Sequence, residues 1–153
     1  MTYEVVIKTV LEQLIAAARR RTTLTAVSEE IGPLLAHPWE FLKERPHLQT
    51  HGRNVAIYWG TPAGVSIEVG VEVGTRFEDQ PEAVCSATPA GTVAMCVHFG
   101  PYDQLGEAHQ AVRQWCAAAD RELATPNWEL YGHWEEDPAR LRTDVLYILK
   151  KRR

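Results

Sequence analysis

Apolar and polar residues alternate along several short stretches of the chain, and this two-residue period predicts β-strands. The clearest stretch is 66–73, because its alternate residues Ile67, Val69, Val71 and Val73 share one face. A second stretch, 92–101, is rich in β-branched residues and is bounded by Gly91 and Gly100. By the same reasoning, further strands are expected at 4–9, 54–59, 82–87, 128–134 and 143–150.

Two segments instead have apolar residues at three- and four-residue spacing, which is typical of helices. The segment 102–123 carries one broad apolar face formed by Leu105, Ala108, His109, Val112, Trp115, Cys116 and Ala119. The other helix starts near Thr25, but Pro33 and Pro38 interrupt its pattern, since each lacks a backbone donor. We expect this helix to break near His37, with Pro38 opening a short second segment.

The predicted elements form an internal repeat with an offset of 78 residues. Residues 4–9 resemble 82–87, and 14–23 aligns with the strand at 92–101. The segment 14–23 is alanine-rich and favours a helix by propensity, but the repeat requires a strand there. Each half is then a strand, a strand, a helix and a hairpin, with one copy at about 3–74 and the other at about 81–150.

This duplication predicts a single α+β domain over 1–153, with antiparallel sheets and two main helices. The two copies are expected to be related by a pseudo-twofold axis. A groove at such an axis is a natural place for a ligand.

Charge and composition exclude several classes of function. The chain has 16 basic and 20 acidic residues, and four of the basic residues form the terminal run 150–153. The other residues, 12 basic against 20 acidic, carry a net charge of −8, so direct contact with nucleic acid is not expected. Apolar runs are too short for a membrane span, and the N-terminus lacks a secretory leader. Cys85, Cys96 and Cys116 lack metal or disulfide spacing, which indicates reduced thiols in a cytoplasmic protein.

The candidate chemistry centres on Glu129. On the strand predicted at 128–134, alternation places Glu129 and Tyr131 on one face and Trp128 and Trp134 on the other. A carboxylate among aromatic residues is costly to bury unless it is paired, although it can also lie half-exposed on a solvated face. Tyr58 and Tyr131 occupy matching places in the two hairpins, so symmetry would bring both phenols to the central groove. Ordinary packing of the two rings is the alternative.

Other aromatic residues are weaker candidates for ligand contacts: Tyr147, Trp39, Phe41 and Trp59. Trp39 and Phe41 lie on the second part of the interrupted helix, where they could line a wall, but such residues are more often core. His98 and His109 lack metal-ligand spacing, and 60–64 lacks the Gly-Lys-Ser/Thr of a phosphate loop. No metal and no cofactor are therefore expected.

Five segments occur in the order seen in the GyrI-like small-molecule-binding domains: 66–73, 88–91 (TPAG), 98–105 (HFGPYDQL), 128–131 (WELY) and 141–145 (LRTDV). The chain resembles this family from about Glu4 to Leu149. The family also includes the effector-binding domains of multidrug-sensing transcription activators. The resemblance implies a ligand-facing acid at Glu129 and a structural role for His98. Because the chain begins inside the domain, we expect a stand-alone member without a fused helix-turn-helix.

Three functions follow from the resemblance. The first is binding and sequestration of hydrophobic or cationic aromatic small molecules, with Glu129 as the counter-charge. The second is hydrolysis of electrophilic cyclopropane-containing genotoxins, with Glu129 as general base and Tyr131 or Tyr58 as proton donor. The third is a protein-partner role, because the family's namesake inhibits a topoisomerase. The physiological ligand, the turnover and the oligomeric state stay open at this stage.

Overall fold

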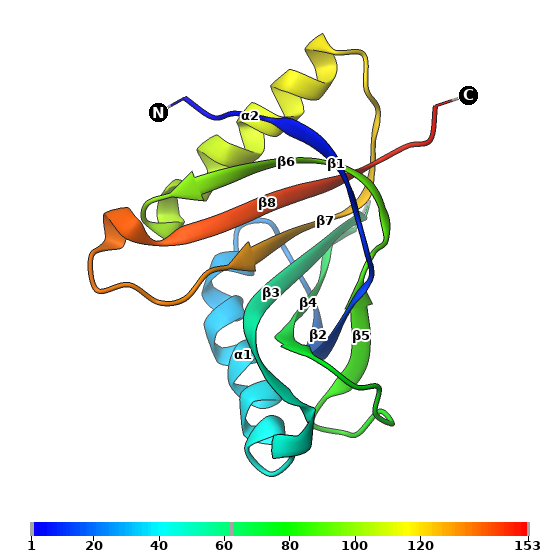
Figure 1. Cartoon of the computed structure of the whole chain (residues 1–153), viewed down its shortest axis with the longest axis vertical. Coiled ribbons are helices and arrows are strands. Elements are labelled where there is room, and N and C mark those ends of the chain that lie inside the picture. Colours follow the sequence, from blue (N-terminus) through cyan, green and yellow to red (C-terminus); the bar gives the residue numbers. More distant parts are fainter. Residues whose placement is uncertain (1, 62, 153) are drawn as a thin grey trace.

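The computed structural model describes residues 2–61 and 63–152. Within them the chain forms an eight-stranded antiparallel sheet with two α-helices, α1 (Val27–Lys43) and α2 (Leu105–Ala118) (Figure 1). Short 3-10 helices lie at Pro46–Leu48, Tyr102–Gln104 and Pro138–Arg140. The strands are β1 (Val6–Val10), β2 (Gln13–Thr22), β3 (Gln49–Thr61), β4 (Gly64–Val73), β5 (Val84–Thr88), β6 (Gly91–Phe99), β7 (Leu123–Tyr131) and β8 (Arg142–Leu149). In this part of the chain, neither α1 nor α2 is long and apolar enough to cross a membrane.

The strand order, β1-β6-β8-β7-β3-β4-β2-β5, confirms the duplicated α+β architecture. Reading it from either end gives equivalent strands of the two halves, so a pseudo-twofold axis passes between β3 and β7. Val6 pairs with Met95, and Val84 pairs with Ala17, so shifting each half by 78 residues exchanges the two pairs. The first strand of each half therefore completes the sheet of the other half. The halves share one continuous sheet instead of forming separate ones.

The alanine-rich segment is strand β2, as the repeat required and against its helical propensity. Ala16 and Ala17 are fully buried, and Ala17 pairs with Gly70 on β4. A Cβ atom on Gly70 would lie 2.1 Å from the carbonyl oxygen of Ala16. Small side chains are needed here because the two strands approach closely, which explains a composition that otherwise favours a helix.

The expected break near His37 is wrong, because α1 continues through both Pro33 and Pro38. Each internal proline removes a hydrogen bond and costs about 3 kcal/mol. Apolar residues on both sides of the prolines are buried against β2 and β4, and each contributes about 1.5–3 kcal/mol. This packing offsets the loss and holds the helix in one piece, with the buried positions Leu34, Pro38, Phe41 and Leu42.

The second half differs from expectation at the ends of its elements. The helix predicted at 102–123 is α2, which begins after a 3-10 turn and ends at Ala118. Asp120 has a φ of 55°, a conformation that ends the helix and lets the chain enter β7 at Leu123. β7 ends at Tyr131, before the predicted limit of 134. The turn predicted at 60–64 joins β3 to β4, with Thr61 paired to Gly64, while Pro62 lies outside the described residues.

Apolar side chains are buried on both faces of the sheet. On one face α2 packs on β6 and β8, and α1 packs on β2 and β4. Alternate residues of the same strands form a cluster on the opposite face. The fully buried members of that cluster come from both halves, so the sheet must curl until its own strands cover it: Ile15, Ala17, Val55, Ile57 and Val93.

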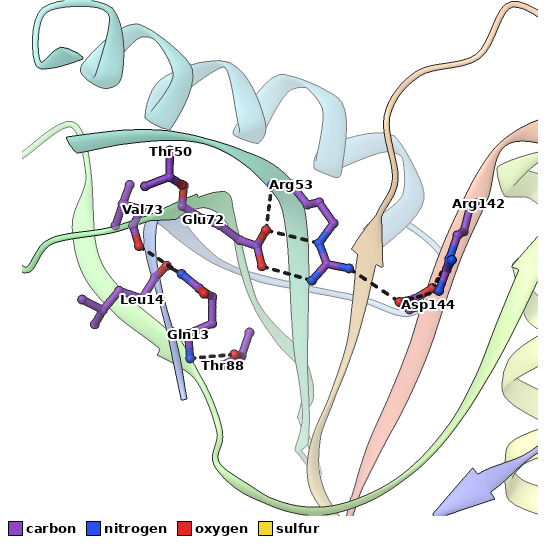
Figure 2. Close-up of polar contacts among 9 residues, drawn as sticks. All are labelled: Gln13, Leu14, Thr50, Arg53, Glu72, Val73, Thr88, Arg142 and Asp144. Atoms are coloured by element: carbon purple, nitrogen blue, oxygen red, sulfur yellow. Dashed lines mark hydrogen bonds and ion pairs between the residues drawn. The ribbon is translucent and has the colours of Figure 1, made fainter. Parts of the chain in front are cut away.

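Arg53 links the two halves across the pseudo-twofold axis (Figure 2). Its backbone nitrogen and Nε donate to Glu72 Oε1 on β4 at 2.8 and 3.2 Å. Its Nη1 lies 3.6 Å from Asp144 Oδ2 on β8, and that carboxylate also accepts from Arg142 Nε at 2.8 Å. Since Glu72 and Asp144 belong to different halves, Arg53 forms an ion-paired link between β4 and β8.

Replacing Gly70 by alanine tests the close approach of β2 and β4. The added Cβ would meet backbone atoms, which cannot rotate away as a side chain can. We expect Gly70→Ala to lower the free energy of unfolding by about 1–3 kcal/mol in urea titrations. Gly106→Ala is the control, because a Cβ there meets nothing within 4 Å and alanine favours the helix. Equal stability of the two variants would contradict the proposed contact.

Candidate functional site

A cavity of about 860 Å³ lies over the strands at the pseudo-twofold axis and is bounded by both helices. The α1 wall is mainly apolar and includes Val27, Ile31 and Leu35. The α2 wall carries Leu105, His109 and Arg113, which recur at four-residue spacing and so share one side of the helix. The floor comes from strands β3, β7 and β8 and includes Tyr58, Asn127, Glu129, Tyr131 and Tyr147.

Glu129 lies at the centre of the floor. It pairs with Ala56 across the axis between β3 and β7, and it is only 4% exposed. Its Oε1 accepts hydrogen bonds from Tyr58 at 2.5 Å and from Tyr131 at 2.6 Å. Tyr58 and Tyr131 are two positions beyond Ala56 and Glu129 on their strands, so the symmetry of the hairpins delivers both phenols to the same oxygen.

A chain of hydrogen bonds leads from Glu129 to the cavity wall. His109 Nε2 lies 2.7 Å from Glu129 Oε2, and His109 Nδ1 lies 2.7 Å from the hydroxyl of Tyr147. That hydroxyl accepts from Arg113 Nη1 at 3.0 Å. We assign the proton of a neutral imidazole to Nε2, because Tyr147 then donates to Nδ1 and every bond in the chain has a donor and an acceptor.

Burial by itself would raise the pKa of Glu129, but the hydrogen bond and charge of His109, with the hydrogen bonds of Tyr131 and Tyr58, bring it below its ordinary value. The pKa values of Tyr58 and Tyr131 are raised, first by burial and then by the neighbouring carboxylate. At neutral pH the site therefore holds Glu129 as an anion that accepts hydrogen bonds from two neutral phenols and from His109. Hydrogen bonds from these donors, instead of contact with solvent, stabilise the buried carboxylate.

Exposed apolar side chains lie where the cavity opens. Leu24 and Trp134 line it while being 80% and 75% exposed. Tyr102 is also exposed, and its ring meets that of Tyr131 edge to face with centroids 5.5 Å apart. Large apolar groups in water at the opening of an apolar cavity are typical of a ligand site.

The structure places Glu129, Tyr131, Tyr58 and Tyr147 together in the cavity. The symmetry argument predicted this position for Tyr58 and Tyr131, and a ligand-binding role for all four stays a prediction. Other candidates do not line it. Phe41 is 3% exposed and packs on Phe77 in the core beneath α1, because the unbroken helix turns it toward the sheet. Trp59 packs against the cluster on the other face of the sheet. Trp39 lies at the surface and donates to Asn54, which does line the cavity.

The sequence analysis missed His109, Arg113 and Trp134 as cavity residues. The sequence analysis counted His109 within the apolar face of α2. A polar imidazole in an otherwise apolar helix face was the signal that could have identified it as a site residue. Trp134 was placed opposite Glu129 by strand alternation, but β7 ends at Tyr131 and alternation stops there. His98 lies outside the cavity, fully buried, with its ring nitrogens 2.8 Å from the Tyr3 hydroxyl and 3.1 Å from the Pro101 carbonyl oxygen.

Comparison with known proteins gives a consistent result. Residues 3–149 match the sequence model of the GyrI-like small molecule binding domain. Among solved structures, the C-terminal domain of EcmrR is similar with a TM-score of 0.82 and 21% identity, covering 99% of each chain. No curated protein sequence matches the chain.

Two more distant structures share the fold. SAV2435, solved bound to tetraphenylphosphonium, has a TM-score of 0.72 at 9% identity and covers 98% of this chain and 94% of its own. A hydrolase from Listeria innocua has a TM-score of 0.64 at 9% identity, and the match covers 96% of this chain and 92% of the hydrolase. At these identities the likeness concerns the fold alone.

The lowered pKa of Glu129 predicts a pH dependence of stability. Its folded-state pKa is below the ordinary value of 4.5, so its stabilisation is complete above that pH and is lost as the pH falls through the folded-state pKa. We expect the wild-type protein to lose more free energy of unfolding than Glu129→Gln between about pH 6 and pH 3. Urea titrations across this range measure the difference.

Glu136→Gln is the matched control, because Glu136 is exposed and lies outside the cavity lining. It should follow the wild-type pH profile. A Glu129→Gln profile parallel to that of the wild type would mean that Glu129 titrates as an ordinary carboxylate.

Proposed function

Because the chain belongs to the GyrI-like small-molecule-binding family, we propose that it binds lipophilic aromatic cations in this cavity, with Glu129 as their counter-charge. The observation that carries the proposal is a buried carboxylate held as an anion on the floor of an apolar cavity. Such a charge attracts cations, and the surrounding rings exclude ligands that need extensive hydration.

The cavity suits a cation whose charge is spread over aromatic rings. A delocalised cation loses its hydration at low cost, so the attraction of Glu129 is not cancelled by desolvation. Tyr58, Tyr131 and Tyr147 are available for cation–π contacts, each worth about 0.5–2 kcal/mol. Apolar contact with α1 adds roughly 25 cal/mol per Å², a contribution that depends little on ligand shape. These properties favour broad selectivity.

The structure of SAV2435 with tetraphenylphosphonium supports the proposal, because that ligand is a delocalised aromatic cation and that protein has the same fold. The likeness to the EcmrR C-terminal domain supports a small-molecule role in the same way. In this protein the proposed outcome of binding is sequestration of the compound.

Hydrolysis of a strained electrophile is the second candidate, favoured by phenols next to a carboxylate. Glu129 would then remove a proton from the water that attacks the strained ring, and Tyr58 or Tyr131 would protonate the oxygen on which negative charge develops as the ring bond breaks. The hydrogen bonds around Glu129 weigh against this reaction. A general base works best with a pKa near neutral, and the pKa of Glu129 is lowered. Both phenols already donate to Glu129, so each would have to leave it to act as an acid.

Tetraphenylphosphonium and tetraphenylborate provide the test, because they have the same shape and opposite charge. We expect saturable quenching of tryptophan fluorescence by the cation and at least ten-fold weaker binding of the anion. Glu129→Gln should weaken cation binding about ten-fold or more, which corresponds to about 1.4 kcal/mol. The readout is favoured by Trp134, which lies in the cavity wall.

Glu136→Gln should bind the cation like the wild type, since this residue does not line the cavity. Equal affinity of the wild type and Glu129→Gln for the cation would refute the counter-charge. Turnover of a strained electrophile that Glu129→Gln abolishes, without cation binding, would favour the hydrolase.

A further inference from the structure

Arg113 brings a positive charge into the same cavity. It lies on α2 one turn after His109, is exposed, and lines the wall. Its Nη1 donates to Tyr147, which engages one of the five N–H donors of a guanidinium group. Across residues 2–61 and 63–152, the ion pairs that form do not involve Arg113.

Other arginines that contact buried acids in this protein have a structural explanation. Arg19 pairs with Glu68, and Arg53 bridges Glu72 and Asp144, so their charges are neutralised by side chains of the sheet. Arg113 departs from this pattern, since its charge faces a hydroxyl instead of a carboxylate. An arginine in a cavity wall without an acidic partner is well suited to an anionic group of a ligand.

In the part of the chain that the structure describes, Arg113 forms no direct ion pair with Glu129. Between the two charges lie Tyr147 and the ring of His109, joined by contacts of 3.0, 2.7 and 2.7 Å. The cavity thus contains an anion on its floor and a cation on its wall, at the two ends of one hydrogen-bonded chain. A ligand that fills the cavity can meet both charges.

We infer that Arg113 recognises an anionic group, so that the cavity prefers aromatic cations that also carry a carboxylate. The inference rests on the proposed function, since it adds a second point of recognition to the same site. A guanidinium group can bind a carboxylate through two parallel hydrogen bonds, which a single positive charge on lysine does not reproduce. Because Arg113 is exposed, solvent screens its attraction for a ligand carboxylate. We therefore expect the loss of Arg113 to weaken the binding of such a ligand by roughly three- to ten-fold.

Rhodamine B and its ethyl ester are the probes, because they share the aromatic cation and differ in whether the benzoate is free or esterified. Dye anisotropy measures the dissociation constant of each dye for the wild type, Arg113→Gln and Arg140→Gln. Arg140 is the matched control, since it is exposed, lies outside the cavity lining, and its replacement removes the same charge.

We expect Arg113→Gln to weaken the binding of rhodamine B about three- to ten-fold. The same substitution should change the binding of the ethyl ester by less than about two-fold. Arg140→Gln should change neither dye. The ester therefore reports whether the cavity of Arg113→Gln is intact.

An unchanged affinity of Arg113→Gln for rhodamine B would overturn the inference, and so would an equal loss for both dyes, which indicates a structural role. In either case binding of the ester to the wild type leaves the proposed function standing. Failure of the wild type to bind both dyes would instead overturn the proposed function, and this inference with it.

Discussion

The structure depends on burying one carboxylate at the pseudo-twofold axis. Glu129 is 4% exposed and lies opposite Ala56, where β3 and β7 join the two halves of the sheet. A charge in this position is stable only when its oxygens are hydrogen-bonded. Tyr58 and Tyr131 supply two of these bonds, one from each half, so the duplication that builds the sheet also stabilises the charge. The floor of the cavity and the joint between the halves are the same set of residues.

Asymmetry between the halves gives the cavity its chemistry. Glu129 lies opposite Ala56 across the axis, so there is no repelling pair of carboxylates at this position. His109 and Arg113 come from α2, whereas α1 presents the apolar Val27 and Ile31 to the same space. One helix thus contributes charge and hydrogen bonds, and the other contributes apolar surface.

Much of the architecture could be predicted from local patterns. Alternation located β4 and β6, and the repeat identified β2 correctly although its alanines favour a helix. Errors occurred where packing overrides a local rule. Pro33 and Pro38 were expected to break α1, but local propensity contains no information on the sheet that buries both sides of that helix. Phe41 was a candidate for the cavity for the same reason, and the continuous helix turns it into the core.

The sequence by itself determined the duplication, the class of fold, and the expected position of Tyr58 and Tyr131 at the central groove, because strand alternation and internal symmetry are properties of spacing. Only the tertiary structure decided that His109 and Arg113 join them. Their distance from Glu129 depends on how α2 crosses β8, and the spacing of residues in the chain does not encode that crossing. The tertiary structure also decided the ionisation of Glu129. Burial raises the pKa of this carboxyl group, and hydrogen-bond donors from β3, β7 and α2 lower it.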